Sequence, residues 1–322
     1  MLRILFRCDS SDIIGTGHVT RSLALAEEFI EAGWQVDFCG NFARPIWLNK
    51  FLESYYQIKF YPVGSEKIEK SKYDVVCFDH YNLSSEEFSE FSNLGRFKIW
   101  IVDDKSPQFD SDLYISTLPE CYLPDFYRGK NQLFGLDYAL IRKSIRSVVE
   151  GFKFNSDNFS KIETVAILTG GTENLPLTEL FINKISSINP SLNYLTNLEN
   201  SNSMNSRFLL NVMNISKSPE FFLKLMGCDL IISPASVSSW EVVYSRIPLA
   251  VYGILKNQTS TYKFLTESKL ATGLGLTSNQ LNFEIMERNL IDFIINNESN
   301  RNEELIDGLG SSRILRYVLN RI

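Results

Sequence analysis

The stretch LRILFRCDSSDIIGTGHVTRSLALAEEFIEAGWQVDFCG, residues 2–40, decides the fold of this chain. Residues 2–7 and 35–40 are short apolar runs typical of buried strands. Between them, residues 18–32 have the amphipathic pattern of a helix. Two parallel strands need a crossover of this kind, so the stretch predicts one β-α-β unit.

The same alternation of apolar runs and amphipathic stretches continues along the chain. Continuous apolar strands between helices indicate mostly parallel sheets covered on both faces. The polar residues 150–162 interrupt the pattern and are the predicted linker. We therefore expect an α/β protein of two Rossmann-like domains facing a cleft. The N-terminal domain is expected over residues 1–155, and the C-terminal domain over residues 156–322, ending in two closing helices. The expected strands are 2–7, 35–40, 58–62, 74–79, 98–102, 113–116, 164–168, 193–196, 208–212, 230–233 and 249–252, and the expected helices are 18–32, 45–54, 85–93, 176–186, 219–226, 237–245 and 258–268.

The composition narrows the class of protein. A length of 322 residues with 44% hydrophobic residues supplies two cores. The formal net charge of −6 argues against nonspecific binding to nucleic acid or to an anionic membrane, but it permits a phosphate-bearing small molecule. The five Cys form no CxxC pair, so free thiols are expected and a structural zinc is not. With no signal peptide and no apolar run of spanning length, a cytoplasmic location is expected, and a monomer is compatible with the sequence.

The loop after the first strand carries the first candidate site. Gly15 and Gly17 permit tight turns, and they let the backbone of a helix start approach an anion. A dinucleotide fingerprint is the alternative, because Asp37 lies at a suitable distance downstream. However, Thr20 stands at the third glycine position, and the loop before the glycines is long. No Lys follows the glycines, which excludes a P-loop, and no cofactor or metal is expected.

His18 follows the two glycines at the expected helix start, where the helix dipole favours neutral imidazole. Neutral imidazole suits a general base, but position alone equally allows a residue that only holds the turn. His80, the only other His, also follows a strand, and a structural or substrate-positioning role is expected for it. Asp103 and Asp104 are adjacent on an extended chain and point apart, so loop fixation is favoured over a metal site.

The second half of the chain holds two more candidate anion sites. Gly170, Gly171 and Thr172 form a glycine turn after the strand 164–168. In the stretch 228–258, hydroxyl side chains surround the start of the helix 237–245, where they can cap the helix and bind phosphate together. The hydroxyl residues and the first helical residue are Ser236, Val237, Ser238 and Ser239.

Three further residues of this stretch have two interpretations each. Glu241 can accept both hydroxyls of a ribose, or it can complete a capping box with Ser238. Asn257 and Gln258 follow the next strand, as ligand contacts or as a cap and a surface amide. Their place at a strand end favours ligand contacts.

Taken together and in order, these segments resemble a known family, the UDP-sugar hydrolases of the pseudaminic acid pathway. The resemblance runs from residue 3 to about residue 275, and IDGLGSSRI (306–314) resembles the tail of longer members. Glu173 stands where the family pattern has Asp. The segments that carry the resemblance are DSSDIIGTGHVTRSLALA (9–26), FDHY (78–81), VDD (102–104), GLDYALIR (135–142), TGGTE (169–173), LIISPASVSSWE (230–241) and KNQ (256–258).

The resemblance implies a glycosyltransferase-B architecture, akin to MurG-type transferases, and a reaction. Such enzymes hydrolyse UDP-2,4-diacetamido-2,4,6-trideoxy-β-L-altrose to UDP and the free sugar without a metal. His18 matches the family's catalytic base. The second domain would hold UDP through Gly171, Ser236, Ser238 and Glu241. Tyr81, Asn257 and Gln258 would lie near the diphosphate and sugar, while Arg7, Asp9 and Arg142 would either touch the substrate or fix loops.

Two rival functions share these features. A glycosyltransferase of the same architecture would share every nucleotide-binding feature and differ only in its acceptor. A non-catalytic nucleotide-sugar binding protein would bind UDP without turnover, and His18 would be dispensable in it.

Overall fold

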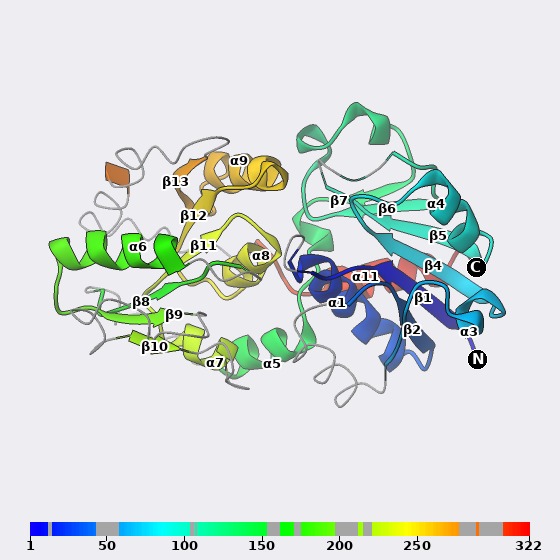
Figure 1. Cartoon of the computed structure of the whole chain (residues 1–322), viewed down its shortest axis with the longest axis horizontal. Coiled ribbons are helices and arrows are strands. Elements are labelled where there is room, and N and C mark those ends of the chain that lie inside the picture. The colour runs from blue at the N-terminus through cyan, green and yellow to red at the C-terminus, as the bar shows by residue number, and fades with distance from the viewer. Residues whose placement is uncertain are drawn as a thin grey trace. The chain divides into compact units, whose positions relative to one another are not determined.

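The computed structural model describes residues 1–11, 15–42, 58–103, 106, 108–152, 162–170, 175–196, 212–214, 221–276, 288–289 and 305–322. The chain forms two compact units (Figure 1). The first consists of Met1–Lys143 and Ile306–Ile322, and the second of Ser144–Leu305. Among the described residues, no helix is long and apolar enough to cross a membrane.

The first unit is built on a seven-stranded sheet in which every neighbouring pair is parallel. The chain builds outward from β1 in one direction and then returns to build from β4 in the other. The carboxyl ends of β1 and β4 therefore flank a topological switch point, where open α/β sheets bind ligands. The strands, in sheet order, are β3 (Lys59–Tyr61), β2 (Gln35–Cys39), β1 (Arg3–Cys8), β4 (Tyr73–Asp79), β5 (Gly95–Ile101), β6 (Leu113–Ser116) and β7 (Gln132–Phe134).

Helix α1 (Gly17–Glu31) is fixed against this sheet by its apolar face. Val19, Leu23 and Ala26 are buried in the same core as Ile4 and Phe6 of β1. The connection from β1 turns tightly before the helix, because Gly15 has φ +73° and Ser11 and Gly15 exchange backbone hydrogen bonds of 2.8 and 3.3 Å. The first residues of α1 are thus held at the carboxyl end of β1.

The second unit repeats this plan with a six-stranded parallel sheet. Its switch point lies between β8 and β11. The strands, in sheet order, are β10 (Val212–Asn214), β9 (Asn193–Thr196), β8 (Thr164–Ile167), β11 (Leu230–Pro234), β12 (Leu249–Gly253) and β13 (Thr272–Leu276). The helices of this unit that bear on the argument are α6 (Leu175–Ile188), α7 (Phe221–Met226), α8 (Val237–Tyr244) and α9 (Thr259–Glu267).

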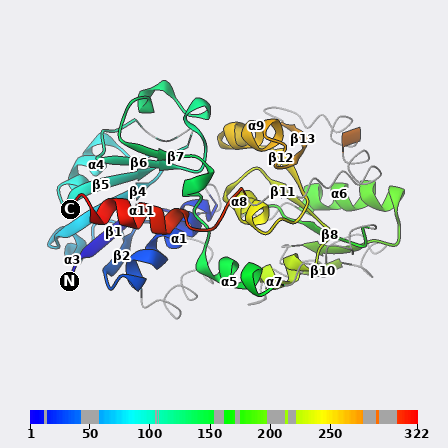
Figure 2. The ribbon, with the colours of Figure 1, turned by 180° about the vertical axis from the view of Figure 1, so that it is seen from behind.

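The predicted domain limits are corrected at both ends. The units divide after Lys143, so α5 (Lys143–Gly151) mostly belongs to the second unit, and the boundary lies before the predicted linker. The C-terminal helix α11 (Gly310–Leu319) belongs to the first unit and packs along α1, as Figure 2 shows. The physical reason is apolar burial, because Ile314 and Val318 are fully buried in the core beneath α1.

Polar contacts and a close backbone approach hold α11 in the same place. The Ser312 hydroxyl donates to the Glu28 carboxylate of α1 at 2.7 Å. A Cβ at Gly310 would lie 2.3 Å from the carbonyl oxygen of Ala139, so only glycine fits at that crossing.

The two-sheet α/β fold and most of the expected elements are confirmed, with ends that differ by at most three residues. Of the strand expected at 208–212, residues 208–211 lie outside the described residues, and the described strand β10 occupies Val212–Asn214. Two edge strands, β7 and β13, were missed, and both have residues of intermediate exposure rather than a buried apolar run. The expected helix at 45–54 lies outside the described residues.

Candidate active site

His18 lies at the switch point of the first sheet, as the second residue of α1, and is only 3% exposed. Its Nδ1 is bonded to the carboxylate of Asp79, the last residue of β4. Asp79 is fully buried, and its partner in the sheet register is Cys8 at the end of β1. An ionised carboxylate only accepts hydrogen bonds, so in the neutral form of His18 the Nδ1 carries the proton and the Nε2 has the lone pair. This is the tautomer that a general base requires.

Arg21 holds the carboxylate of Asp79 from the other side. It lies one turn after His18 on α1, and its Nε donates to Oδ2 of Asp79 at 2.6 Å while its Nη2 donates to Oδ1. Burial by itself raises the pKa of Asp79, but the charge of Arg21 and the hydrogen bonds from Arg21 and His18 outweigh it, so the net pKa lies below the usual range. Asp79 is therefore ionised at neutral pH and can orient the imidazole.

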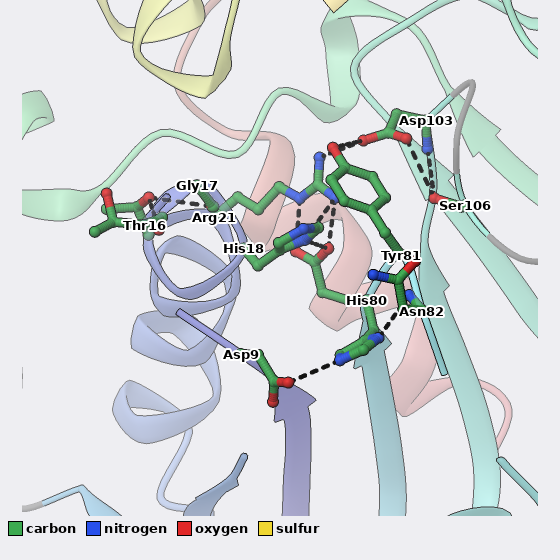
Figure 3. A network of polar contacts seen from close by, with 12 residues as sticks. Asp9, Thr16, Gly17, His18, Arg21, His80, Tyr81, Asn82, Asp103 and Ser106 are labelled. Carbon is green, nitrogen blue, oxygen red and sulfur yellow. Dashed lines mark hydrogen bonds and ion pairs between the residues drawn. The ribbon is translucent and has the colours of Figure 1, made fainter. Parts of the chain in front are cut away.

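Asp103 and Tyr81 extend this cluster, as Figure 3 shows. The Tyr81 hydroxyl donates to Oδ2 of Asp103 at 2.7 Å, and Nη1 of Arg21 donates to the same oxygen at 3.3 Å. The ring of Tyr81 stands edge-on to His18, with centroids 4.4 Å apart and planes at 74°. We call His18, Arg21, Asp79, Tyr81 and Asp103 the His18 cluster.

A second polar group lies beside the His18 cluster and fixes the loop after β1. His80 bonds Oδ2 of Asp9 through Nε2 at 2.8 Å, while the backbone N–H of Asn82 donates to its Nδ1 at 2.9 Å. Arg7 bonds the other carboxylate oxygen of Asp9, and the backbone N–H of Asn41 donates to that oxygen at 3.0 Å. Both ring nitrogens of His80 are thus engaged, as expected for a structural His.

The pKa of Asp9 reflects these contacts. Burial raises it, but the hydrogen bond from His80 and the charge of Arg7 outweigh burial, and the net pKa falls well below the usual range. These bonds are those of a loop-fixing carboxylate. A contact between Asp9 and substrate stays a prediction, as does one from Arg142, which lies half-buried just before α5.

At the switch point of the second sheet, hydroxyl groups surround the start of α8. Ser236 is the N-cap residue, and its Oγ lies 3.0 Å from the Oγ of Ser238. The hydroxyl of Ser239 donates to the carbonyl of Pro234 at 2.8 Å and accepts the backbone N–H of Ser236 at 3.2 Å. The N-cap contact at this helix therefore joins Ser236 to Ser239. The alternative of a capping box between Ser238 and Glu241 is wrong, because Glu241 is the fifth residue of the helix.

Gly170 turns away from β8 with φ +82°, and a Cβ there would lie 3.4 Å from Pro234 at the end of β11. The glycine turn and the start of α8 are therefore neighbours within the second unit. Gly171 and Thr172 lie outside the described residues, as does Asp104 of the first unit.

Gln258 stabilises the turn that follows β12. Its Oε1 accepts the backbone N–H groups of Ile254 and Leu255 at 2.8 and 3.1 Å, which fixes the turn after β12. The expected helix start is shifted here, since Lys256–Gln258 forms the short 3-10 helix η6 and α9 begins at Thr259. Ligand contacts from Asn257 and Gln258 stay predictions.

Sequence reasoning missed Asp79 and Arg21 and assigned Asp103 only to its loop. Two signals were present. Asp79 directly precedes His80 at a strand end, and Arg21 lies three residues after His18, where helical residues share a face. The partnership of Asp79 with His18 depends on β4 pairing beside β1, which the local sequence does not state. Among the described residues there is no group of three or more His, Cys, Asp or Glu side chains arranged to hold a metal ion.

Comparison with known proteins agrees with the resemblance drawn from the motifs. No family model matches the chain. The UDP-2,4-diacetamido-2,4,6-trideoxy-β-L-altropyranose hydrolase of Campylobacter jejuni subsp. jejuni serotype O:2 is 26% identical over 288 residues, which cover 83% of this chain and 97% of the relative.

Solved structures show the fold. The glycotransferase of kitacinnamycin matches with a TM-score of 0.65 at 13% identity, covering 99% of both chains. Acinetobacter baumannii MurG matches with a TM-score of 0.60 at 13% identity, again over 99% of both chains. S. aureus MnaA, solved with UDP, matches with a TM-score of 0.65 at 13% identity, over 100% of this chain and 98% of its own. The chain thus has the glycosyltransferase-B fold, and its sequence resembles that of a UDP-sugar hydrolase.

Proposed function

We propose that this chain hydrolyses a UDP-linked diacetamido-trideoxy sugar, in the pattern of UDP-2,4-diacetamido-2,4,6-trideoxy-β-L-altrose, to UDP and the free sugar. The observation that carries the proposal is the buried pairing of His18 with Asp79, in a chain 26% identical to such a hydrolase. A His held by a carboxylate at Nδ1 presents Nε2 as a base.

In the proposed mechanism, the Nε2 of His18 removes a proton from water as the water oxygen attacks the anomeric carbon. A C–O bond to the sugar forms, and the bond to the diphosphate oxygen breaks with its electron pair leaving on UDP. Attack from the opposite face inverts the anomeric configuration. Asp79 stabilises the positive charge that His18 gains, and the proton then passes to solvent. UDP is a good leaving group and needs little acid assistance.

The second unit is proposed to bind UDP. The hydroxyls of Ser236 and Ser238 and the backbone N–H groups at Val237 are suited to phosphate, because the start of α8 carries the positive end of the helix dipole. Gly170 lies beside Pro234, which precedes the same helix start, and Gly171 and Thr172 follow Gly170 in the sequence. Glu241 is proposed for the ribose hydroxyls, and Tyr81, Asn257 and Gln258 for the diphosphate and sugar.

The test is a product assay with purified protein, no acceptor, and a panel of UDP-linked diacetamido sugars, run in ¹⁸O-labelled water. The expected result is UDP release with one ¹⁸O atom at the anomeric carbon of the sugar and none in UDP. Label appearing in UDP would contradict attack at carbon. An undiminished rate in EDTA is expected, since the proposed chemistry uses no metal.

A glycosyltransferase is the second candidate, because two of the solved structures that share this fold are named as glycosyltransferases. It would release little UDP from the panel until an acceptor is added. A protein that binds UDP and releases none under either condition would be a binding protein only.

A further inference from the structure

His80 lies beside the proposed base and joins two segments of the chain that meet there. It directly follows Asp79 at the end of β4, and its side chain is 11% exposed. Asp79 contacts His18, whereas the ring of His80 lies between Asp9, which follows β1, and the backbone of Asn82, as Figure 3 shows. Successive residues of an extended chain point to opposite sides, so the end of β4 reaches both the base and the loop before it.

The hydrogen bonds of His80 fix which ring nitrogen carries its proton. The backbone N–H of Asn82 donates to Nδ1 at 2.9 Å, so this nitrogen presents its lone pair. In neutral His80 the proton is therefore on Nε2, which donates to Oδ2 of Asp9 at 2.8 Å. This is the opposite tautomer to that of neutral His18, whose Nδ1 donates to Asp79.

The Nε2 bond acts on the loop after β1 through the carboxylate of Asp9. Oδ1 of this carboxylate contacts Arg7 and accepts the backbone N–H of Asn41, so it holds the ends of β1 and β2 together. The two strand ends approach so closely that a Cβ at Gly40 would lie 2.7 Å from Oδ1. Oδ2 contacts His80, which ties the same carboxylate to the end of β4.

The loop that begins at Asp9 leads directly to the base. Ser11 and Gly15 exchange two backbone hydrogen bonds, which close the loop on itself. Helix α1 begins two residues after Gly15, and His18 is its second residue. The position of Asp9 therefore bears on the position of His18.

The Nδ1 bond acts on the turn that carries Tyr81. Because the ring of His80 accepts the N–H of the second residue after it, the two ends of a short turn are joined, and Tyr81 is its middle residue. The ring of Tyr81 stands edge-on to His18, and its hydroxyl donates to Asp103 at 2.7 Å. Tyr81 is one of the residues proposed to contact the diphosphate and sugar. The Nδ1 bond thus bears on how the substrate is held.

We propose that His80 is a positioning residue whose two ring nitrogens have separate roles. Its Nε2 fixes, through Asp9, the loop that holds His18, and loss of this bond lowers kcat. Its Nδ1 fixes the turn that presents Tyr81 to the substrate, and loss of this bond raises KM. The role rests on the proposed function, since the base and the substrate contact are those of the proposed hydrolysis. His80 acts through these residues and does not touch the reacting atoms.

Two amide substitutions separate the two roles. In His80→Gln the amide nitrogen takes the place of Nε2 and keeps the bond to Asp9, while the bond from Asn82 is lost. In His80→Asn the amide oxygen takes the place of Nδ1 and keeps the bond from Asn82, while the bond to Asp9 is lost. With a substrate from the panel, His80→Asn should lose about tenfold in kcat with KM within about twofold, because a hydrogen bond to a carboxylate is removed. His80→Gln should raise KM about fivefold with kcat within about twofold, because a neutral hydrogen bond is removed.

Asp229→Asn is the matched control for the loss of a bond that fixes a segment of chain. Asp229 accepts the backbone N–H groups of Glu163 and Thr164 at 2.9 Å each, and so fixes the start of β8 in the second unit. Its loss should lower the free energy of unfolding by about 1 kcal/mol and leave kcat and KM within about twofold of the wild-type values.

NMR of histidine-labelled protein gives a readout that needs no substrate, because the chain contains only two His. At about pH 9, above the ordinary pKa of imidazole, the ¹⁵N spectrum of the wild-type protein should show the proton of His18 on Nδ1 and that of His80 on Nε2. In each His80 variant the signal of His18 remains alone. It should shift from its wild-type position in both variants, because the loop before His18 or the ring beside it has moved, and it should stay in place in Asp229→Asn.

Several results would overturn this role of His80. They are a proton on Nδ1 of His80 in the wild-type protein, an unmoved His18 signal in both variants, equal effects of the two substitutions on kcat and KM, or the reverse division. If one variant does not fold, the other variant and the wild-type tautomer decide. Turnover by the wild-type protein without the division of kcat and KM would leave the hydrolase intact and remove the role of His80. The expected NMR results without UDP release from any sugar would remove the hydrolase and leave the positioning of His18 by His80 intact.

Discussion

Two helix starts lie beside the switch points of the two sheets, one after the first strand of its sheet and the other after the strand across the switch point, and their side chains differ in kind. Helix α1 follows β1 and helix α8 follows β11, each beside a switch point. At α1 the side chains are charged and bond one another, as in the contacts among His18, Arg21 and Asp79. At α8 they are neutral hydroxyls around a helix N-terminus. A charged, mutually bonded cluster sets protonation states, whereas hydroxyls and free N–H groups bind an anion. This difference supports the proposed function, in which the first unit transfers the proton and the second unit binds the anion.

The largest expected effect comes from removing the base at α1. His18→Asn should lower kcat by about 10²–10⁴-fold, the usual contribution of a general base. UDP affinity, measured by calorimetry, should stay within about twofold, since UDP is assigned to the other helix start. Wild-type turnover in this variant would contradict the role of His18 as the base. Loss of UDP binding would contradict the proposal that the two units have separate roles.

The next largest expected effect is that acid destabilises the first unit before the second. Asp9, Asp79 and Asp307 each have a clearly lowered pKa, and all three belong to the first unit. A lowered folded-state pKa gives stability that is present above the unfolded-state value of about 4 and is lost as pH falls through the folded-state value. For Asp9 and Asp79, the stability given by the lowered pKa is therefore present at neutral pH and is lost on acidification.

Hydrogen exchange at pH 7 and pH 3 tests this order of unfolding. Protection should fall first in β1, β4 and α1, while β8 and β11 keep theirs. Asp9→Asn should be less stable than wild type at pH 7 and should lose less stability on acidification. Earlier loss of protection in the second sheet would show that other groups govern acid unfolding.

The third effect concerns the contribution of helix α11 to the stability of helix α1. Ser312→Ala removes the hydrogen bond that ties α11 to Glu28 of α1, and Glu28 is 8% exposed. Losing a hydrogen bond to a buried charged group should cost about 1–3 kcal/mol of unfolding free energy. Ser187→Ala, which removes an exposed bond within α6, is the control and should cost less than about 0.5 kcal/mol. Equal losses in the two variants, measured by denaturant unfolding, would mean that α11 does not stabilise α1 through this contact.

The two helix starts also differ in how much of each could be predicted from the sequence. The β-α-β order, both glycine turns and the serines at α8 were predictable, because they depend on local apolar pattern and on residue types at a strand end. His18 was predictable as a candidate for the same reason. Its partner Asp79 was not, since their contact depends on which strand lies beside β1, and that is settled by pairing 71 residues apart at Ile4 and Val75. The prediction that places α11 in the second domain was wrong for a similar reason. Amphipathicity shows that a helix packs against an apolar surface, but it does not identify that surface.

The smallest expected effect tests the α8 half of the comparison by separating two neighbouring hydroxyls. The Oγ of Ser238 lies 3.0 Å from that of Ser236 at the helix start, while Ser239 is fully buried and donates to the carbonyl of Pro234. If the helix start binds phosphate, Ser238→Ala should weaken UDP binding by about fivefold, the worth of one ordinary hydrogen bond, and leave the unfolding free energy within about 0.5 kcal/mol. Ser239→Ala should do the reverse, costing about 1 kcal/mol of stability because it strips the cap of α8. Because the two residues are adjacent and chemically identical, a common loss of UDP affinity in both variants would mean that α8 needs its cap rather than its hydroxyl surface. The second unit would then have to hold its anion through backbone N–H groups alone.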